Sequence, residues 1–366
     1  MPLVVIILDN FLYKSNMNNR QLTFAREYRG LNQSDLASNI SGLSQSNLSK
    51  FEKGLGYLSE AIQKEIIEFL DFPEGFFDLK INNVVDNANY RKRSGVTKNA
   101  VQTFELRCKL IGYIIDQMSE DIDWPEFTFI PLNVDEGFSP EYIASYTRKK
   151  LGLEQFDSVK NIFTLIESKG IIIYEIDAIE KFDGVSFVTD KGYPVIIINK
   201  NFSNDRKRFT LAHELGHLLM HNENNYPIPS YRDKEQEANN FASEFLMPEN
   251  AMKNSLRGLR FNDLGEFKSY WLTSMASIIR RAYTLGCINQ KEYTYFNIQM
   301  SRYGYNKVEP IKVFIDCPTL FAKATKLFQV DLSYSDNELQ GYLKLPMDIL
   351  NDLLLGANEN KLKVIR

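Results

Sequence analysis

All three histidines of this 366-residue chain lie in one short stretch, as His213, His217 and His221, and Glu214 directly follows the first. Residues four apart lie one turn apart on the same face of an α-helix, so the imidazoles of His213 and His217 can bind one ion. Glu214 is rotated by about a quarter turn, so its carboxylate meets a water on the metal rather than the metal itself. The pattern predicts a zinc-binding helix.

A catalytic zinc site has three protein ligands and one open position. The chain has no histidine outside this stretch. His221 lies two turns from His213, roughly 12 Å along the helix axis, which is too far for both to reach one ion. We therefore expect the third ligand to be a carboxylate, and His221 to orient a neighbouring group from just outside the ligand set.

The carboxylate is expected on a second amphipathic helix, over residues 233–248. Its predicted apolar face consists of Ala238, Phe241, Ala242 and Phe245. Glu235 stands three residues before Ala238 and so lies on the inward face, which favours it as the third ligand. Glu237 and Glu244 remain as alternatives.

These residue types point to hydrolysis. Zinc lowers the pKa of its water toward about 7 and polarises a carbonyl, while a neighbouring glutamate accepts the proton of the water and passes it to the leaving amine. We assign this role to Glu214. Tyr226, Tyr231 and His221 are candidates for stabilising the tetrahedral intermediate. The alternative is a buried helix whose histidines have no such role.

The residues before the histidine stretch predict an α+β arrangement. Two helical segments are followed by three β-branched segments separated by Gly, Pro and Asp. The helical segments are residues 142–151 and 159–169, and the strand candidates are residues 170–176, 184–188 and 194–198.

The histidine stretch, residues 208–221, together with residues 235–242 and 246–248, resembles the ImmA/IrrE family of metallopeptidases. The resemblance extends over about residues 139–310. It implies a zincin-like fold, His213, His217 and Glu235 as zinc ligands and Glu214 as catalytic base. It also implies that the substrate is a transcriptional repressor protein.

The amino end has a different character. The chain carries a net charge of −4, yet basic residues outnumber acidic ones between Lys14 and Lys53. The pattern predicts three short helices, with the second beginning at Gln33 or Ser34 and the third capped by Ser44. Leu48 and Phe51 are expected to face inward. The polar side chains suited to contact base edges and phosphates in a major groove are Gln33, Gln45, Ser46, Asn47, Ser49 and Lys50.

Residues 26–33, 36–37 and 42–54 resemble the phage-repressor type of helix-turn-helix, the XRE family. The resemblance covers about residues 18–79 and implies binding to double-stranded DNA. Because such domains usually read two half-sites as dimers, it also makes a homodimer an expectation. The alternative is a small helical bundle used for dimerisation.

Together these features predict a multi-domain chain: an all-α helix-turn-helix domain, an α+β zincin-like metallopeptidase domain and a small, mostly helical C-terminal region. The expected divisions are an N-terminal extension at 1–17, the DNA-binding domain at 18–80, a linker and connecting helix at 81–138, the peptidase domain at 139–310 and a C-terminal subdomain at 311–366. Within these, helices are expected over residues 101–118, 271–281 and 345–355.

Three separated cysteines without a CxxC pair indicate a reducing compartment, the cytoplasm. No segment is apolar over a length that would predict a membrane helix. We therefore expect a cytoplasmic DNA-binding regulator fused to a zinc endopeptidase that cleaves a repressor. The alternative is a non-catalytic or antitoxin-like transcription factor whose metal domain senses a ligand or a partner. The intact Glu214 favours the enzyme.

Overall fold

The computed structural model describes residues 17–82, 98–178, 182–221 and 227–355. Two compact units can be distinguished among them. The N-terminal unit contains the described residues up to Ile81 together with Tyr334–Asp352, and the central unit contains those from Asn82 to Ser333 and from Leu353 on. None of the helices in these ranges combines the length and the apolar composition needed to cross a membrane.

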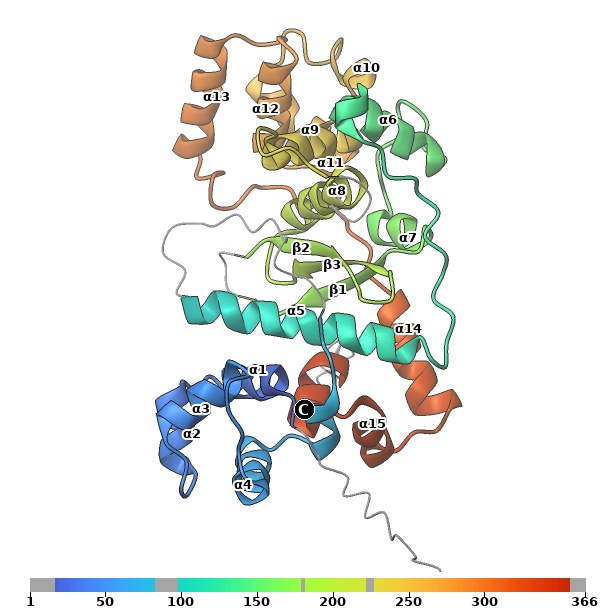
Figure 1. The fold of residues 1–366 in the computed structure, drawn as a ribbon. Helices are drawn as coiled ribbons and strands as arrows, with labels where there is room; N and C mark the ends of the chain where they lie inside the picture. Colours follow the sequence, from blue (N-terminus) through green and yellow to red (C-terminus); the bar gives the residue numbers. More distant parts are fainter. Residues whose placement is uncertain (1–16, 83–97, 179–181, 222–226, 356–366) are drawn as a thin grey trace, which may run out of the picture. The chain divides into compact units, whose positions relative to one another are not determined.

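The N-terminal unit is helical (Figure 1). Its helices are α1 (Asn19–Tyr28), α2 (Gln33–Asn39), α3 (Gln45–Glu52), α4 (Glu60–Leu70), the 3-10 turn η1 (Glu74–Asp78), α15 (Asp336–Leu343) and α16 (Met347–Leu350). Side-chain caps explain where several of them begin. Asn32 and Asp35 form a reciprocal capping box at α2, and the Ser44 side chain accepts a hydrogen bond from the Asn47 backbone at α3.

A buried ion pair joins α1 to α3 in the N-terminal unit. Arg26 of α1 donates from Nε to Oε1 of Glu52 on α3 over 2.7 Å, and both side chains are buried. Leu48 and Phe51 of α3 point into the core, as the sequence pattern predicts. Of the two predicted starts of α2, Gln33 is the one observed, and the predicted cap of α3 by Ser44 is confirmed.

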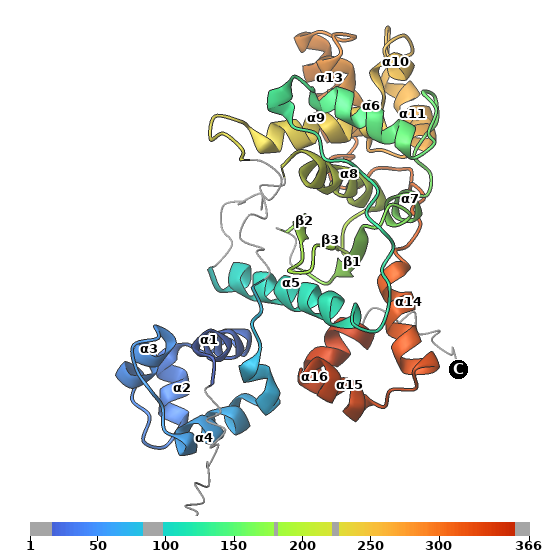
Figure 2. The ribbon, with the colours of Figure 1, turned by 45° about the vertical axis from the view of Figure 1, so that its right-hand side comes forward.

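The central unit surrounds a small sheet with helices (Figure 2). Before the sheet lie α5 (Lys98–Met118), η2 (Val134–Glu136), α6 (Pro140–Lys150) and α7 (Ile162–Glu167). After it lie α8 (Asn204–Met220), α9 (Lys234–Leu246), α10 (Glu249–Met252), η3 (Phe261–Asp263), α11 (Leu264–Trp271), α12 (Met275–Thr284), α13 (Gln290–Arg302), α14 (Leu320–Lys326) and the π-helical turn η4 (Leu327–Asp331). A further π-helical turn, η5 (Asn351–Leu355), spans the boundary between the units.

The sheet has three strands in the order β1 (Ile172–Ile176), β3 (Pro194–Asn199), β2 (Gly184–Val188). β1 pairs with β3 in parallel and β2 pairs with β3 antiparallel, so β2 is an edge strand. The three predicted strands are confirmed, and so is the expected combination of helices with a small sheet.

The two faces of the sheet contact different helices because side chains alternate along a strand. Ile173, Ile196 and Ile198 join the core that includes Leu211 and Leu215 of α8. On the other side lies α5, as both ribbon views show. There Phe104 of α5 stacks on Phe182 with ring centroids 4.5 Å apart.

Two glycines allow the elements around α8 to approach closely. A Cβ on Gly184 of β2 would lie 2.7 Å from Cγ2 of Thr210 on α8. A Cβ on Gly216 of α8 would lie 3.0 Å from the ring of Phe241 on α9. The absent side chains therefore place both β2 and α9 directly against the histidine helix.

The expected helix over residues 271–281 is wrong in one respect. Trp271 ends α11, and α12 begins only after Ser274, because Leu272 has the left-handed backbone angle φ 56°. The break is held from outside, since Nε of Arg208 donates to the Leu272 carbonyl over 2.9 Å. The Ser274 side chain then accepts from the Ser277 backbone and caps α12.

Candidate metal centre

Two histidines of α8 face each other across one helical turn. Nε2 of His213 lies 3.0 Å from Nε2 of His217, and both side chains are buried. The four-residue spacing places them on one face of the helix. Both nitrogens can therefore contact the same ion.

Glu235, near the start of α9, completes the group. Its Oε2 lies 3.6 Å from Nε2 of His213 and its Oε1 lies 3.3 Å from Nε2 of His217. A tetrahedral zinc ion, about 2.0–2.1 Å from each ligand atom, holds these atoms roughly 3.3 Å apart. Two imidazole nitrogens and one carboxylate oxygen also form a ligand set typical of zinc. The group His213, His217 and Glu235 thus fits a zinc ion.

The surroundings of Glu235 favour its ionised form. Partial burial raises the pKa of its carboxyl, but a cation between its oxygens and Nε2 of His213 and His217, whether a proton or a metal ion, outweighs burial and holds the pKa well below its usual range. The carboxyl is therefore negative at neutral pH and supplies charge for a divalent cation.

The other ring nitrogen of His213 is positioned by α9. Nδ1 of His213 lies 3.1 Å from Oδ1 of Asn239, an amide oxygen that can only accept a hydrogen bond. The proton of the neutral imidazole is thus on Nδ1, and the lone pair is on Nε2. This tautomer is the one that a metal on Nε2 requires.

A longer chain of contacts leads away from His217. Nδ1 of His217 lies 2.8 Å from Nδ1 of His221, and Nε2 of His221 lies 2.7 Å from Oε2 of Glu237. Nε of Arg232 donates to Oε1 of Glu237 over 3.0 Å. His221 is thus beside the metal group, where the spacing argument places it, and both of its ring nitrogens contact neighbouring groups. Burial, followed by the charge of His217, lowers the pKa of His221 to about 3.

Glu214 is buried next to the metal group and is held by the sheet. Its Oε2 accepts a hydrogen bond from Oγ of Ser186 over 2.8 Å. Ser186 lies on β2, on the same strand face as Gly184, where only small side chains leave room for α8. Sequence reasoning missed Ser186. The available signal was the alternation along β2 of small Gly184 and Ser186 with large Val185 and Phe187.

Residues 166–283 match the family model of the IrrE N-terminal-like domain, Peptidase_M78. The match includes the sheet, α8 and α9, and therefore the whole metal group. It covers about a third of the chain and does not reach the helices α1–α4. A search of curated proteins found no match to the chain. The chain therefore carries an IrrE-like domain of a peptidase family around its candidate metal centre.

The two alternative carboxylates have other contacts within the IrrE-like domain. Glu237 contacts His221 and Arg232, as described above. Glu244 is buried against Arg281 and accepts a hydrogen bond from the Glu249 backbone at the start of α10. Among the carboxylates that the sequence left open, the structure brings Glu235 to the histidine pair.

An open cavity of about 620 Å³ lies beside the metal group. Residues 228–235 line it, including Glu235. Tyr231 projects from this segment with 79% of its surface exposed, and its hydroxyl donates to Oδ1 of Asp135 over 3.1 Å. Of the three candidates for stabilising an intermediate, Tyr226 lies outside the described residues and His221 has both nitrogens engaged. Tyr231 remains.

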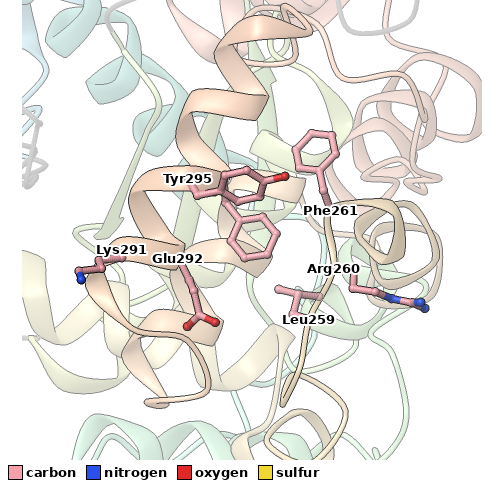
Figure 3. Close-up of a pocket in the computed structure, with 7 residues that line it drawn as sticks. Leu259, Arg260, Phe261, Lys291, Glu292 and Tyr295 are labelled. Atoms are coloured by element: carbon pink, nitrogen blue, oxygen red, sulfur yellow. The ribbon is translucent and has the colours of Figure 1, made fainter.

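A second cavity, of about 440 Å³, lies between η3 and α13 (Figure 3). Its lining residues are Leu259, Arg260, Phe261, Lys291, Glu292, Tyr295 and Phe296. No residue of the metal group belongs to this lining, so the cavity next to Glu235 is the one relevant to chemistry there.

The candidate DNA-contact residues lie around α3. Gln45, Ser46, Asn47 and Lys50 are exposed, whereas Ser49 and Gln33 are half-buried. Nε2 of Gln45 donates to Oε1 of Gln33 over 2.8 Å, and Nε2 of Gln33 donates to Oε2 of Glu52 over 2.7 Å. This contact orients the first residue of α3 against the first residue of α2.

Proposed function

We propose that the IrrE-like domain is a zinc-dependent endopeptidase in which Glu214 is the general base. The observation that carries the proposal is the position of Glu214, which is buried, directly follows His213 in α8 and is held by Ser186. A site that only binds a metal has no need of a positioned carboxylate next to its ligands. The match to a peptidase family supports the same reading.

Each residue of the proposed active site has a separate role. His213, His217 and Glu235 hold zinc, which when bound supplies the Lewis acidity that activates water and polarises the scissile carbonyl. Glu214 accepts the proton of the attacking water and delivers it to the amine that leaves. The Ser186 hydroxyl fixes one carboxylate oxygen of Glu214, so the other oxygen is directed to the proton that it takes.

A polypeptide substrate suits the surroundings of Glu214. The cavity along residues 228–235 is open rather than enclosed, and β2 is an edge strand. An edge strand can pair with an extended peptide through backbone hydrogen bonds. We propose a transcriptional repressor protein as the substrate, in keeping with the resemblance to ImmA/IrrE peptidases.

We further propose that the N-terminal unit binds double-stranded DNA through α3, and does so as a homodimer. Support comes from the exposed polar side chains Gln45, Ser46 and Asn47 and from Lys50, together with the short α2–turn–α3 arrangement. A DNA-binding unit would bring the peptidase to the operators at which its repressor substrate acts.

The decisive experiment is Glu214→Gln in the full chain, tested on repressor proteins encoded near the gene of this chain. The variant is expected to bind zinc like the unchanged protein and to lose cleavage by about 100-fold or more. Glu249→Gln, a surface carboxylate paired with Lys253, is the matched control. Equal cleavage by Glu214→Gln and by the control contradicts the role of Glu214 as general base. If the unchanged protein binds no zinc, the proposal of a zinc-dependent peptidase is wrong.

DNA binding is tested separately with a duplex retardation assay at several salt concentrations. Lys50→Ala should weaken binding to all sequences and reduce the salt slope by about one, whereas Asn47→Ala should relax sequence preference. If the full chain retards no duplex at low salt, the helical-bundle alternative takes the place of the DNA-binding proposal.

A further inference from the structure

A relay of four side chains, of which Glu237 alone is partly exposed, starts at the metal group and ends on the segment before α9. We define the relay as His217, His221, Glu237 and Arg232, in order of contact. The His221 side chain is 1% exposed and the Arg232 side chain 3% exposed. Buried polar groups are retained where their hydrogen bonds are satisfied, so the direction of each bond is constrained.

The donor and acceptor roles along the relay follow from the Glu237 carboxylate. Glu237 receives two hydrogen bonds from Arg232, over 3.0 Å and 2.5 Å, and as an ion-paired carboxylate it can only accept. Nε2 of His221 must therefore donate to Glu237. A neutral imidazole has one proton, so Nδ1 of His221 carries a lone pair and accepts.

The hydrogen bond between His221 and His217 fixes the tautomer of a member of the metal group. Because Nδ1 of His221 accepts, Nδ1 of His217 must donate to it over 2.8 Å. The lone pair of His217 is then on Nε2, the nitrogen that faces His213 and Glu235. Asn239 imposes the same tautomer on His213. Both histidines are thus set in the form that binds a metal before any metal arrives.

The Glu237 carboxylate also holds the segment before Glu235 in place, through Arg232. Arg232 contacts Oδ2 of Asp135 at 3.4 Å as well as Glu237, and the Tyr231 hydroxyl donates to Asp135. Residues 228–235 form the wall of the open cavity beside the metal group. Glu237 therefore connects the tautomer of His217 with the placement of the cavity wall.

We propose that Glu237 is a positioning residue: it sets the metal-binding tautomer of His217 through His221, and it fixes the cavity wall through Arg232. The first half rests on the zinc site of the proposed function but not on peptide cleavage. The second half predicts that a change at Glu237 also raises the KM for a polypeptide substrate.

The first measurement needs no variant. The chain has only three histidines, so full-length protein labelled with ¹⁵N-histidine gives three imidazole spin systems. In metal-free protein at neutral pH, His213 and His217 are expected as Nδ1–H tautomers and His221 as the Nε2–H tautomer. An Nε2–H tautomer at His217 overturns the proposal, whatever happens to the variants.

The second measurement compares Glu237→Gln with Gln236→Ala. The amide that Glu237→Gln introduces can donate to Nε2 of His221, which reverses the relay and protonates Nε2 of His217. We expect the zinc Kd of this variant to rise by about 10- to 100-fold, with a mixed tautomer at His217. Gln236 neighbours Glu237 but is exposed and contacts Asn240, so its replacement should leave Kd and tautomers unchanged.

The outcomes separate this proposal from the peptidase proposal. Expected tautomers and a weakened zinc Kd, without cleavage of any repressor, support the positioning role and count against the peptidase. A zinc Kd of Glu237→Gln within about twofold of the unchanged protein, with the His217 tautomer retained, overturns the positioning role. A loss of thermal stability alone, with Kd and tautomers intact, marks Glu237 as structural and overturns it too.

Discussion

Two small residues decide how closely β2 approaches the histidine helix. Gly184 and Ser186 lie on the strand face that meets α8, and Ser186 reaches Glu214 only because the neighbouring position has no side chain. A larger group at Gly184 would meet Thr210 of α8 and the carbonyl oxygen of Ile197. The position of the Glu214 carboxylate thus depends on the absence of a methyl group at Gly184.

Gly184→Ala is expected to lower the free energy of unfolding by about 1–3 kcal/mol, because overpacking forces β2 away from α8. It should also reduce peptide cleavage, since Ser186 moves with the strand. Urea denaturation and a cleavage assay measure the two effects. An unchanged free energy of unfolding together with full cleavage would show that β2 has more room than its contacts indicate.

Gly341→Ala provides a control of opposite sign. Gly341 lies inside α15, and a Cβ there would have no neighbour within 4 Å. Alanine in the interior of a helix is favoured over glycine by about 0.5–1 kcal/mol, so the variant should be slightly more stable.

Helix periodicity was sufficient to predict the residue pairs within one helix. His213 and His217 share a face because of their spacing, and Glu235 faces inward because of its distance from Ala238. Ser186 could not be found in this way, because its contact with Glu214 joins a strand to a helix. Only the packing of β2 on α8 brings the two side chains together.

At the scale of elements, buried ion pairs join helices around the centre. Glu244 near the end of α9 is paired with Arg281 of α12, and Nε of Arg281 donates to the Met247 carbonyl over 2.9 Å. These contacts fix the end of α9, whereas Glu235 near its start faces the metal group. One helix thus carries a carboxylate that joins two helices and a carboxylate of the candidate metal group.

Glu244→Gln should lower the free energy of unfolding by about 3–5 kcal/mol, because the buried charge of Arg281 loses its partner. The zinc Kd should not change. Chemical denaturation and a chelator competition assay test both statements, with Glu249→Gln as a surface control expected to cost less than about 1 kcal/mol. A weaker zinc Kd without a loss of stability would instead assign Glu244 to the metal.

A second buried cluster connects α8 with α11. Nζ of Lys268 donates to Asp205 over 2.7 Å and to Glu309 over 2.6 Å. Burial raises the pKa of Asp205, but the hydrogen bond and charge of Lys268 outweigh it, so the pKa lies below its usual value of 3.8. The pair therefore stabilises the fold above that value and loses its effect as the pH falls through the lowered pKa.

Asp205→Asn is accordingly expected to be less stable than the unchanged protein at about pH 7, and the difference should shrink as the pH falls below about 3.8. Urea unfolding at a series of pH values measures it. A difference that stays constant over this range would mean that the lost interaction does not depend on the charge of Asp205.

For the molecule as a whole, a segment near the C-terminal end of the chain packs with the N-terminal helices. Tyr334–Asp352 belongs to the same compact unit as the N-terminal helices. Arg29 caps the C-terminal end of α1, and its Nη1 donates to Asp348 over 2.5 Å. The Lys344 side chain lies against Gly75. The sequence pattern placed these residues in a C-terminal subdomain at 311–366, and the divisions of the chain at 17, 80, 138 and 310 remain predictions.

Leu343→Ala should therefore affect helices far away in the sequence. Leu343 is fully buried, and its truncation is expected to cost about 2–5 kcal/mol through the cavity left behind. Hydrogen exchange should become faster in α1–α4, while the zinc Kd stays unchanged. Asp348→Asn, which removes only a half-exposed ion pair, should change exchange little. Faster exchange confined to α15 and α16 would contradict a shared unit.

Local periodicity along the chain was enough to predict several features of the candidate site and of the fold. It predicted the paired histidines with Glu214, the inward position of Glu235, three strands and the short helices at the amino end. It favoured Glu235 as the third ligand but left Glu237 and Glu244 open, because all three lie on one helix.

The remaining features depend on how the helices pack against one another. The packing of α9 on α8 brings Glu235 to the histidines, turns Glu237 to His221 and gives Glu244 to Arg281. The break at Leu272 is likewise held by Arg208, a residue on another helix. These features depend on contacts between residues far apart in sequence. The periodicity of a single helix or strand predicts which of its residues share a face, but not which residues of another element they contact.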